Sequence, residues 1–438
     1  MSSRPGRIHG SLERARGWAR WAALGLGCLA PTLATIGAEF QINAPAPTLD
    51  RWMYPFGDFD GARPVSPTWA SFDLRFDTRD GQFLLAWDTA NRIPTNAPAS
   101  RYLVTKVRVT VEHSPLPSQP SFVYDPTYDS YRTYLTNALA LPDGDTGRPI
   151  ELYGVGYRGG FNALSFGEAS SFGVINSINN PTNVSIGTRN AYAADFGTDG
   201  QLRDISNNVG QAFEPFEVAP FAVGQTTAVA PGEVVPDGTR FAFDLDLTNP
   251  LVMGYLQTAL RQGRLPVMLS SLHRARAAAG GIGVGGGVYP NWVTKENLLG
   301  EPATLLLEGV LISDTDTDGD GLPDDWERVI FGDLSQTGEG DFDGDGASNR
   351  AEFLAGTDPR NAQSRLRILS VTAGPGVVTT LRFPFASSRS YRVETSSLDG
   401  GWATAGGTFE YSGSGEARWQ ASAPSAAALQ FYRVVVAE

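Results

Sequence analysis

A twelve-residue pattern of acidic residues and glycine occurs twice within residues 316–352, and it constrains the fold more than any other feature. Each copy fits D-x-[DN]-x-[DN]-G-x5-E without a mismatch, the first at residues 316–327 and the second at residues 341–352. At average residue frequencies such a pattern is expected at roughly a few start positions per million. Two copies so close together therefore indicate a functional arrangement of oxygen-bearing side chains rather than chance.

The spacing of these residues matches the coordination shell of calcium. Calcium takes oxygen ligands at about 2.3–2.6 Å from positions 1, 3, 5, 7, 9 and 12 of such a loop, with a backbone carbonyl at position 7. Glycine at position 6 allows the sharp turn that the loop requires. The sequence therefore predicts two Ca²⁺ ions, whose ligands are Asp316, Asp318, Asp320, Leu322, Asp324 and Glu327 in the first loop and Asp341, Asp343, Asp345, Ala347, Asn349 and Glu352 in the second.

Most of the net charge of the chain lies in this segment. Residues 314–352 contain 13 acidic residues and two arginines, a balance of −11 in a chain whose formal charge is −13. Without counter-ions this charge density repels itself and keeps the segment open. We therefore expect metal binding and local folding to be coupled. The alternative is a solvated acidic linker without a metal, but such a linker has no need of glutamate at position 12.

The first 38 residues have the features of a signal peptide. Five arginines precede an apolar stretch at residues 21–38, and the small residues Ala34 and Ala38 offer cleavage points. A permanent membrane anchor is the alternative, because about 18 apolar residues are the lower limit for a spanning helix. Pro31 weakens that alternative. The chain is therefore expected to be secreted or held at the cell surface, with no membrane association after cleavage.

The composition argues against several classes of function. The only cysteine, Cys28, lies in the predicted signal peptide, which excludes disulfides, thiolate nucleophiles and cysteine-ligated zinc from the mature chain. Its basic residues are scattered and its net charge is negative, so nucleic acid and anionic membranes are not expected as partners. The chain contains no H-E-x-x-H and no G-x-S-x-G motif. No catalytic residue is predicted, although a polysaccharide-degrading enzyme with unrecognised catalytic residues is kept as an alternative.

Three other acidic pairs are weaker candidates for chemistry. Asp244 and Asp246 would share one face of a continuous strand and suit a glycosidase, but a solvated strand face explains them equally well. Two further pairs lie in predicted turns and give only weak support for minor metal ligands; they are Asp58 with Asp60, and Asp143 with Asp145.

Residues 39–312 predict a large β-sandwich domain, because short apolar or alternating segments are separated by Gly, Pro, Asn and Asp. In the clearest strand, residues 103–111, every second residue from Leu103 to Val111 is expected on one buried face. Residues 82–87, 240–245 and 304–312 are further strand candidates. A helix is predicted from a cap at Asn249 to a stop at Gly263, and long surface loops are expected at residues 161–208.

Residues 313–362 form the predicted calcium-loop connector, which ends with a short helix at residues 349–355. Residues 363–438 predict a small β-sandwich with strands at residues 367–371, 379–383, 391–395, 417–421 and 431–436. The predicted fold class is therefore all-β and multidomain, with a large sandwich, a two-calcium-loop connector carrying small helices, and a small C-terminal sandwich.

The acidic loops resemble thrombospondin type 3 repeats and the related loops of secreted bacterial surface proteins. The resemblance rests on the two loops and on the Gly-Thr-Asp-Pro stretch at residues 356–359. It implies repeats that hold calcium and stiffen the connection between domains. Dockerins, which bind a scaffold through a similar doubled loop, are the alternative. Pro323 and Ser348 at position 8 argue against them, because paired loops commonly bridge there through an apolar residue, and proline has no N–H to donate.

The large domain resembles, more weakly, disaggregatase-related carbohydrate-binding sandwiches of secreted bacterial proteins. Residues 83–89, the helix after Asn249, and residues 289–292 and 302–305 carry that resemblance. It implies a polysaccharide or another surface component as the partner. Sugar binding uses flat aromatic faces on an exposed surface. The candidates, which lie in turn-rich stretches and have burial in the core as their alternative, are Trp52, Tyr54, Trp69 and Trp292.

Overall fold

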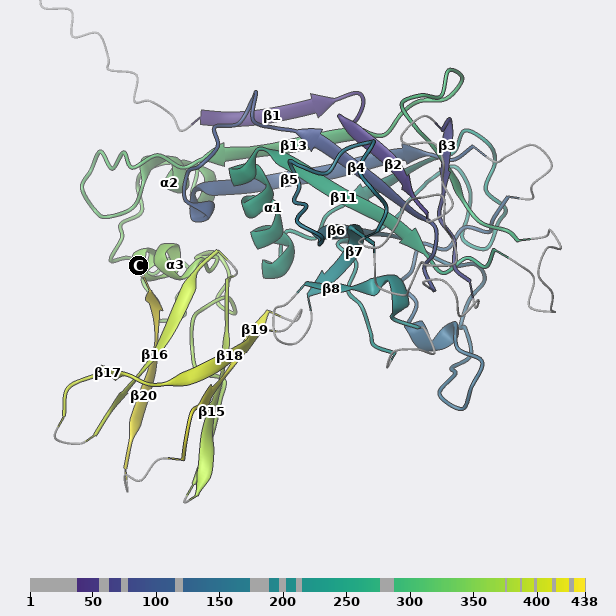
Figure 1. The fold of residues 1–438 in the computed structure, drawn as a ribbon. Helices are drawn as coiled ribbons and strands as arrows, with labels where there is room; N and C mark the ends of the chain where they lie inside the picture. Colours follow the sequence, from purple (N-terminus) through teal and green to yellow (C-terminus); the bar gives the residue numbers. More distant parts are fainter. Residues whose placement is uncertain are drawn as a thin grey trace, which may run out of the picture. The chain divides into compact units, whose positions relative to one another are not determined.

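Strands make up most of the regular structure in the described part of the chain (Figure 1). The computed structural model describes residues 38–437 except for residues 55–62, 72–77, 115–120, 174–188, 197–201, 210–214, 276–286, 375, 387, 398–399, 412–414 and 425–428. The predicted signal peptide lies outside the described residues except for Ala38, which begins the first strand. Among the described residues, no helix combines the length and the hydropathy that crossing a membrane requires.

The large domain contains two antiparallel sheets and a short two-stranded one. The first sheet has the order β1-β13-β5-β10, with β1 at Ala38–Ala44, β13 at Thr304–Leu311, β5 at Tyr102–Glu112 and β10 at Arg240–Asp244. The second has the order β2-β4-β11-β6-β7-β8, with β2 at Leu49–Met53, β4 at Gln82–Asp88, β11 at Arg264–Ser271, β6 at Ile150–Tyr157, β7 at Ala191–Phe196 and β8 at Leu202–Asp204. In addition, β9 (Ala222–Val223) pairs with β6, and β3 (Val65–Pro67) pairs with β12 (Asn291–Val293).

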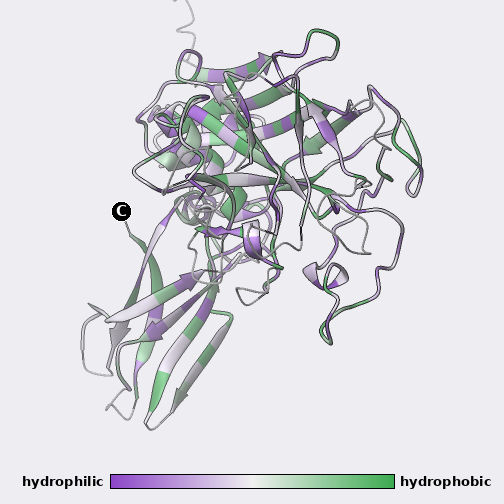
Figure 2. Cartoon of the chain, turned by 45° about the vertical axis from the view of Figure 1, so that its right-hand side comes forward, coloured by the Kyte–Doolittle hydropathy of each residue, from purple (hydrophilic) through white to green (hydrophobic). Residues whose placement is uncertain are grey.

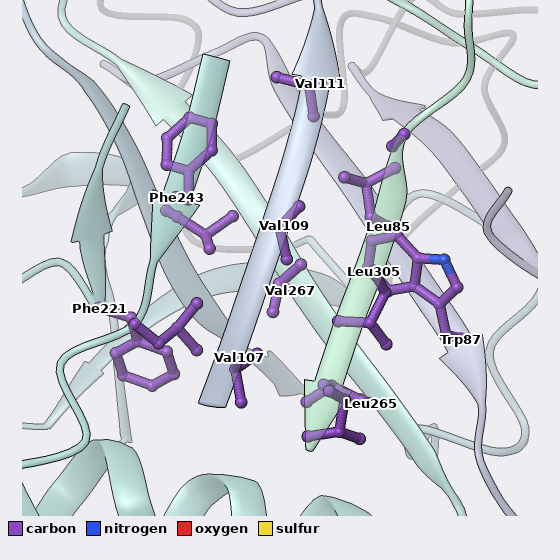
Figure 3. Packing of buried hydrophobic residues seen from close by; sticks show 14 of the residues in the cluster. Leu85, Trp87, Val107, Val109, Val111, Phe221, Phe243, Leu265, Val267 and Leu305 are labelled. Carbon is purple, nitrogen blue, oxygen red and sulfur yellow. The ribbon is translucent and has the colours of Figure 1, made fainter. Parts of the chain in front are cut away.

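The two larger sheets share one hydrophobic core. Val107, Val109 and Val111 of β5 belong to the same buried cluster as residues of β4 and β11 in the other sheet (Figure 3). Helix α1 (Pro250–Gln262) adds Val252 and Leu256 to this cluster. The helix begins and ends as predicted, because the Asn249 side chain caps it and Gly263 ends it at a φ of 90°. The sandwich and its helix therefore follow from the apolar pattern and the caps.

The second sheet is buried on both faces. Residues of β4, β6 and β11 that point away from the shared core form another cluster with Phe166 and Phe172. The prediction of surface loops at residues 161–208 is therefore wrong in part, because this stretch supplies β7, β8 and apolar cover for the sheet. The near-continuous apolar run of β4 is typical of a strand that is covered on both sides.

Strand β5 changes face part-way along. Its register with β13 pairs Lys106 with Glu308 and Val104 with Gly309, so Thr105 has no partner of its own. Such a bulge shifts the alternation by one residue. The predicted buried face is therefore wrong at its start, since Val104 is buried with the core whereas Thr105 is exposed. A Cβ added at Gly309 would overlap the carbonyl oxygen of Leu103, which explains the glycine opposite the bulge.

The C-terminal unit is a small sandwich whose core cluster also includes Leu251 of α1. Its sheets have the orders β14-β15-β19-β18 and β17-β16-β20, with β14 at Ser370–Gly374, β15 at Val377–Pro384, β16 at Ser390–Ser396, β17 at Ala403–Thr404, β18 at Gly407–Tyr411, β19 at Glu416–Ala421 and β20 at Phe431–Ala437. Leu381, Val393 and Trp419 lie in that core. Hydrophobic and hydrophilic residues alternate along several of these strands (Figure 2). Four strands match predicted ones, the predicted strand at residues 367–371 overlaps β14 only at residues 370–371, and β17 and β18 were not predicted.

Two short α-helices lie between the large domain and the C-terminal unit in the sequence, α2 at Asp324–Ile330 and α3 at Asn349–Ala355. The α3 bounds are the predicted ones, with Gly356 ending the helix at a φ of 74°. The predicted all-β multidomain fold class is confirmed, because strands arranged in several sheets dominate and the helices are short. The residue boundaries between the predicted domains stay predictions.

Candidate metal centre

The two acidic loops share one backbone conformation. In each loop the carboxylate at position 1 accepts hydrogen bonds from the N–H groups of positions 4 and 6. Asp316 accepts from Gly319 at 2.8 Å and from Gly321 at 2.9 Å, and Asp341 makes the same pair of bonds at 2.8 Å each. The glycines at positions 4 and 6 have φ angles between 74° and 95° in both loops, namely 76° and 91°, and 75° and 94°. Position 4 thus requires glycine as much as position 6 does.

The predicted carboxylate ligands converge in both loops. Asp316, Asp318 and Asp320 each offer an oxygen, and the three oxygens lie within 4.8 Å of one another. Asp341, Asp343 and Asp345 form the same arrangement in the second loop. Carboxylate oxygens held this close repel one another unless a cation lies between them. The grouping is thus the one that a calcium ion in each loop would need.

The glutamates at position 12 lie in the first turns of α2 and α3, and both are buried, with 0% of Glu327 and 1% of Glu352 exposed. Neither oxygen of Glu327 and only one oxygen of Glu352 has a hydrogen-bond partner among the described residues, that one being the bond from Thr357 to Oε1. A buried carboxylate without a partner is unfavourable unless a cation binds it. The site therefore fits calcium on its own geometry.

Protonation of these glutamates should oppose calcium binding. Burial, together with the neighbouring aspartates, raises the pKa of Glu327 and of Glu352 to about 7 in the metal-free protein. A carboxyl group whose pKa is raised by folding stabilises the folded form below its unfolded pKa, and that contribution is lost as the pH rises through 7. The metal-free connector should therefore be more stable at about pH 5 than at about pH 8.

Calcium binding has the opposite pH dependence, because the ion binds the ionised carboxylates. We expect calcium affinity to rise between about pH 5.5 and about pH 8, the range in which Glu327 and Glu352 lose their protons. Calcium titrations at several pH values measure this, and melting curves of the chelated protein measure the reverse trend. An affinity that does not change with pH would contradict the burial of these carboxylates.

The residues at position 9 hold the loops closed. Asp324 Oδ1 accepts from the N–H of Thr317 at 2.7 Å, and Asn349 Oδ1 accepts from the N–H of Phe342 at 3.2 Å. Both side chains are fully buried. Their assignment as calcium ligands stays a prediction, and so does that of the carbonyl oxygens of Leu322 and Ala347 at position 7.

A stretch between the loops joins them, and the sequence did not indicate it. Gly338 donates its N–H to Asp320 Oδ2 at 2.6 Å, and its carbonyl accepts the N–H of Arg350 at 3.0 Å. Asn349 adds two bonds, from its N–H to the carbonyl of Gly340 at 2.7 Å and from its side chain to the carbonyl of Thr337 at 2.9 Å. Position 5 of the first loop is thus linked to positions 9 and 10 of the second.

The connector is also anchored at each end. Leu322 and Trp326 pack against Val310 and Ile312 at the end of β13, with Leu103 of β5 beside them. The ring of Trp326 lies 5.2 Å from that of Phe353 in α3. At the far end, Arg389 donates to the carbonyls of Phe353 and Leu354 at 2.7 Å each. Apolar and polar contacts therefore tie both loops to the strands that precede and follow them.

The aromatic candidates for sugar binding divide into two groups. The rings of Trp52 and Tyr54 are stacked at 4.3 Å, and Tyr54 meets Trp69 edge-on at 5.3 Å. All three are half-buried, and Tyr289, which was not predicted, continues the row at 6.3 Å from Trp69. The prediction that Trp292 binds sugar is wrong, because its side chain is completely buried in the sandwich core, where its N–H donates to Thr68 at 3.1 Å.

Asp244 and Asp246 show no shared catalytic geometry. Asp244 forms two bonds of 2.7 Å with Arg108, whereas Asp246 lies beyond the end of β10 and accepts from Thr248. The two carboxylates therefore do not share a strand face. Burial lowers the pKa of His113 to about 4 and that of His273 to about 3, so both imidazoles are neutral at physiological pH. Asp58 and Asp60 lie outside the described residues.

Comparison with known proteins bears on the acidic loops alone. Residues 316–332 and 341–362 match the family described as the bacterial TSP3 repeat. Neither a curated protein nor a solved structure matches the chain. The resemblance of the large domain to disaggregatase-related sandwiches thus stays a prediction. The segment that contains both loops is similar to a pair of bacterial TSP3 repeats, and its converging aspartates fit calcium.

Proposed function

We propose that this chain is an exported protein in which two calcium ions stiffen the connection between a large β-sandwich and a small C-terminal one. The carboxylate of Glu327 carries the proposal, because it is fully buried and no described residue donates a hydrogen bond to it. The contacts of Trp326 with the preceding strands and of Arg389 with α3 support the stiffening role. The similarity to bacterial TSP3 repeats supports a location outside the cell.

Removal of calcium should open the connector and leave both sandwiches folded. The loop segment at residues 316–352 contains Arg328 and Arg350, so trypsin can report its opening directly. We expect the mature chain to resist cleavage at these arginines in calcium and to be cut there within the connector after chelation. The two products should stay resistant, because most of the core of each sandwich comes from its own residues. Readdition of calcium is the control, and equal cleavage rates with and without chelator would refute the proposal.

We also propose that the large domain binds a polysaccharide of the cell surface or its surroundings. The row of neighbouring rings formed by Trp52, Tyr54, Trp69 and Tyr289 favours this function, because flat aromatic faces in series suit a chain of sugar rings. The row is contributed by β2 and by residues that flank β3 and β12. Several separate segments thus bring it together.

Retention of the mature chain on a panel of insoluble polysaccharides tests this second function. Replacing Trp69 with alanine should weaken retention by about two- to tenfold, since one aromatic contact contributes about 0.5–1.5 kcal/mol beyond its buried area. Trp402→Ala is the matched control, because Trp402 is exposed in the C-terminal unit. Retention on no polymer would reject the proposal, and release of soluble sugars would instead indicate an enzyme.

A further inference from the structure

Four aspartates of the large domain lie together on two neighbouring loops, far in sequence from the connector. Asp125, Asp129 and Asp145 each offer a carboxylate oxygen, and these three oxygens lie within 4.8 Å of one another. Asp143 belongs to the same group, because Arg148 contacts it at 3.4 Å and contacts Asp129 at 3.3 Å. We name these four residues the aspartate cluster.

Both loops start from fixed parts of the sandwich. Tyr124, whose ring lies in the main core, exchanges backbone hydrogen bonds of 2.8 Å with Gly232 and Glu233. The second loop passes against this segment, since a Cβ at Gly147 would lie 3.0 Å from the carbonyl oxygen of Val123. The carboxylates are therefore held close by the fold rather than brought together by chance in a solvated turn.

The most deeply buried carboxylate of the cluster lacks a complete set of partners. Asp125 is 2% exposed. Its Oδ1 accepts from the N–H of Thr127 at 2.8 Å and lies 2.7 Å from the Thr127 hydroxyl. Its Oδ2 is hidden from solvent and accepts no hydrogen bond from any described residue. The same is true of Asp143 Oδ1. Burying an ionised oxygen without a partner is costly, so each of these atoms calls for a cation.

The protein itself supplies only part of the positive charge that would neutralise these carboxylates. Arg148 is the cation in contact with the cluster among the described residues, and its shortest bond, 2.7 Å, goes to the Thr133 hydroxyl rather than to a carboxylate. Four carboxylates and one guanidinium leave a balance of −3. Burial and the charges of Asp143 and Asp125 accordingly raise the pKa of Asp129 to about 7.

We propose that the aspartate cluster binds a third calcium ion, in the large domain. The donors are carboxylate oxygens, with the Thr127 hydroxyl between Asp125 and Asp145, and such a set suits a hard cation rather than a transition metal. A cavity of about 210 Å³, lined by Asp125 and Asp145 among others, lies against the cluster and gives room for an ion. The ion would fix the loops from Asp125 to Arg148 independently of the connector.

Counting the ions bound by the full mature chain tests this proposal. Equilibrium dialysis against calcium should give three ions for the wild type and two for Asp125→Asn/Asp145→Asn. The exposed Asp237→Asn is the matched control and should keep three. The connector variant Glu327→Gln/Glu352→Gln should keep one high-affinity ion, so a failure of the connector loops and a failure of the aspartate cluster are distinguishable.

Terbium luminescence and melting curves add independent readouts. In the connector variant, Tb³⁺ excited through the tyrosines next to the cluster, such as Tyr124, should emit, and the aspartate substitutions should abolish the emission. Because the Asn variant removes repulsion, its melting temperature without calcium should be unchanged or raised. Two bound ions in the wild type would overturn the proposal, and so would an unchanged ion count in Asp125→Asn/Asp145→Asn. A melting temperature of that variant that falls below the wild-type value by the same amount with and without calcium would also overturn it.

Discussion

Glu327→Gln is expected to lower the calcium affinity of the first loop by at least about 10- to 100-fold, the loss that changes in outer-shell groups alone cause in characterised metal sites. Glutamine keeps the shape of the side chain and removes the charge that would bind the ion through both oxygens. The carboxylate is fully buried, and among the described residues nothing donates to it, so no neighbour can replace the lost interaction. Isothermal titration of the mature chain measures the effect.

Glu352→Gln should have the same effect on the second loop. Glu339→Gln is the matched control for both, since it makes the same charge change at an exposed position between the loops. The control should bind calcium like the wild type if coordination decides affinity, whereas a loss equal to that of Glu327→Gln would mean that net charge alone attracts the ion. Wild-type affinity in both loop variants would refute the metal site.

Gly338→Ala is expected to weaken both loops although Gly338 is in neither of them. A Cβ at this position would overlap the carbonyl oxygen of Asp320, a backbone atom that cannot rotate away. Relieving such an overlap costs about 1–3 kcal/mol, or roughly 5- to 150-fold if the cost falls on calcium binding. Gly338 also donates to Asp320 and accepts from the N–H of Arg350, so the effect should reach the second loop.

Separate titration of the two loops checks this. The background Glu352→Gln isolates the first loop, and Glu327→Gln isolates the second. The Gly338→Ala substitution should reduce affinity in each background, and wild-type affinity of the second loop would show that the two loops fold independently. Gly338 does not have a positive φ. Alanine therefore changes only the space beside Asp320 and adds no backbone strain of its own.

The loops were predictable from sequence because each one is a local structure. Spacing alone fixes which carboxylates of a twelve-residue turn can meet, and the two glycines supply the φ angles that the turn needs. Helix α1 was predictable for a similar reason, since its cap and its stop lie within one turn of its ends. In both cases the deciding contacts join residues that are close in the chain.

Features that depend on distant contacts were not predictable in the same way. Trp292 lies in a turn-rich stretch, as Trp69 does, and only the packing of the two sheets decides that it is buried. The bulge in β5 was missed because Leu103 and Val104 are both apolar, so either phase of the alternation gives a plausible buried face. Gly338 gave no signal, because the carboxylate that it binds is 18 residues away.

The bulge in β5 affects whether the connector can be transferred to another protein. It turns Leu103 out of the main core, toward the surface that receives Leu322 and Trp326. In a strand without the extra residue the alternation would point Leu103 inward and leave that surface smaller. A calcium connector grafted onto a regular sandwich would therefore bind its ions and be held less firmly, unless this one-residue insertion and Gly309 were transplanted with it.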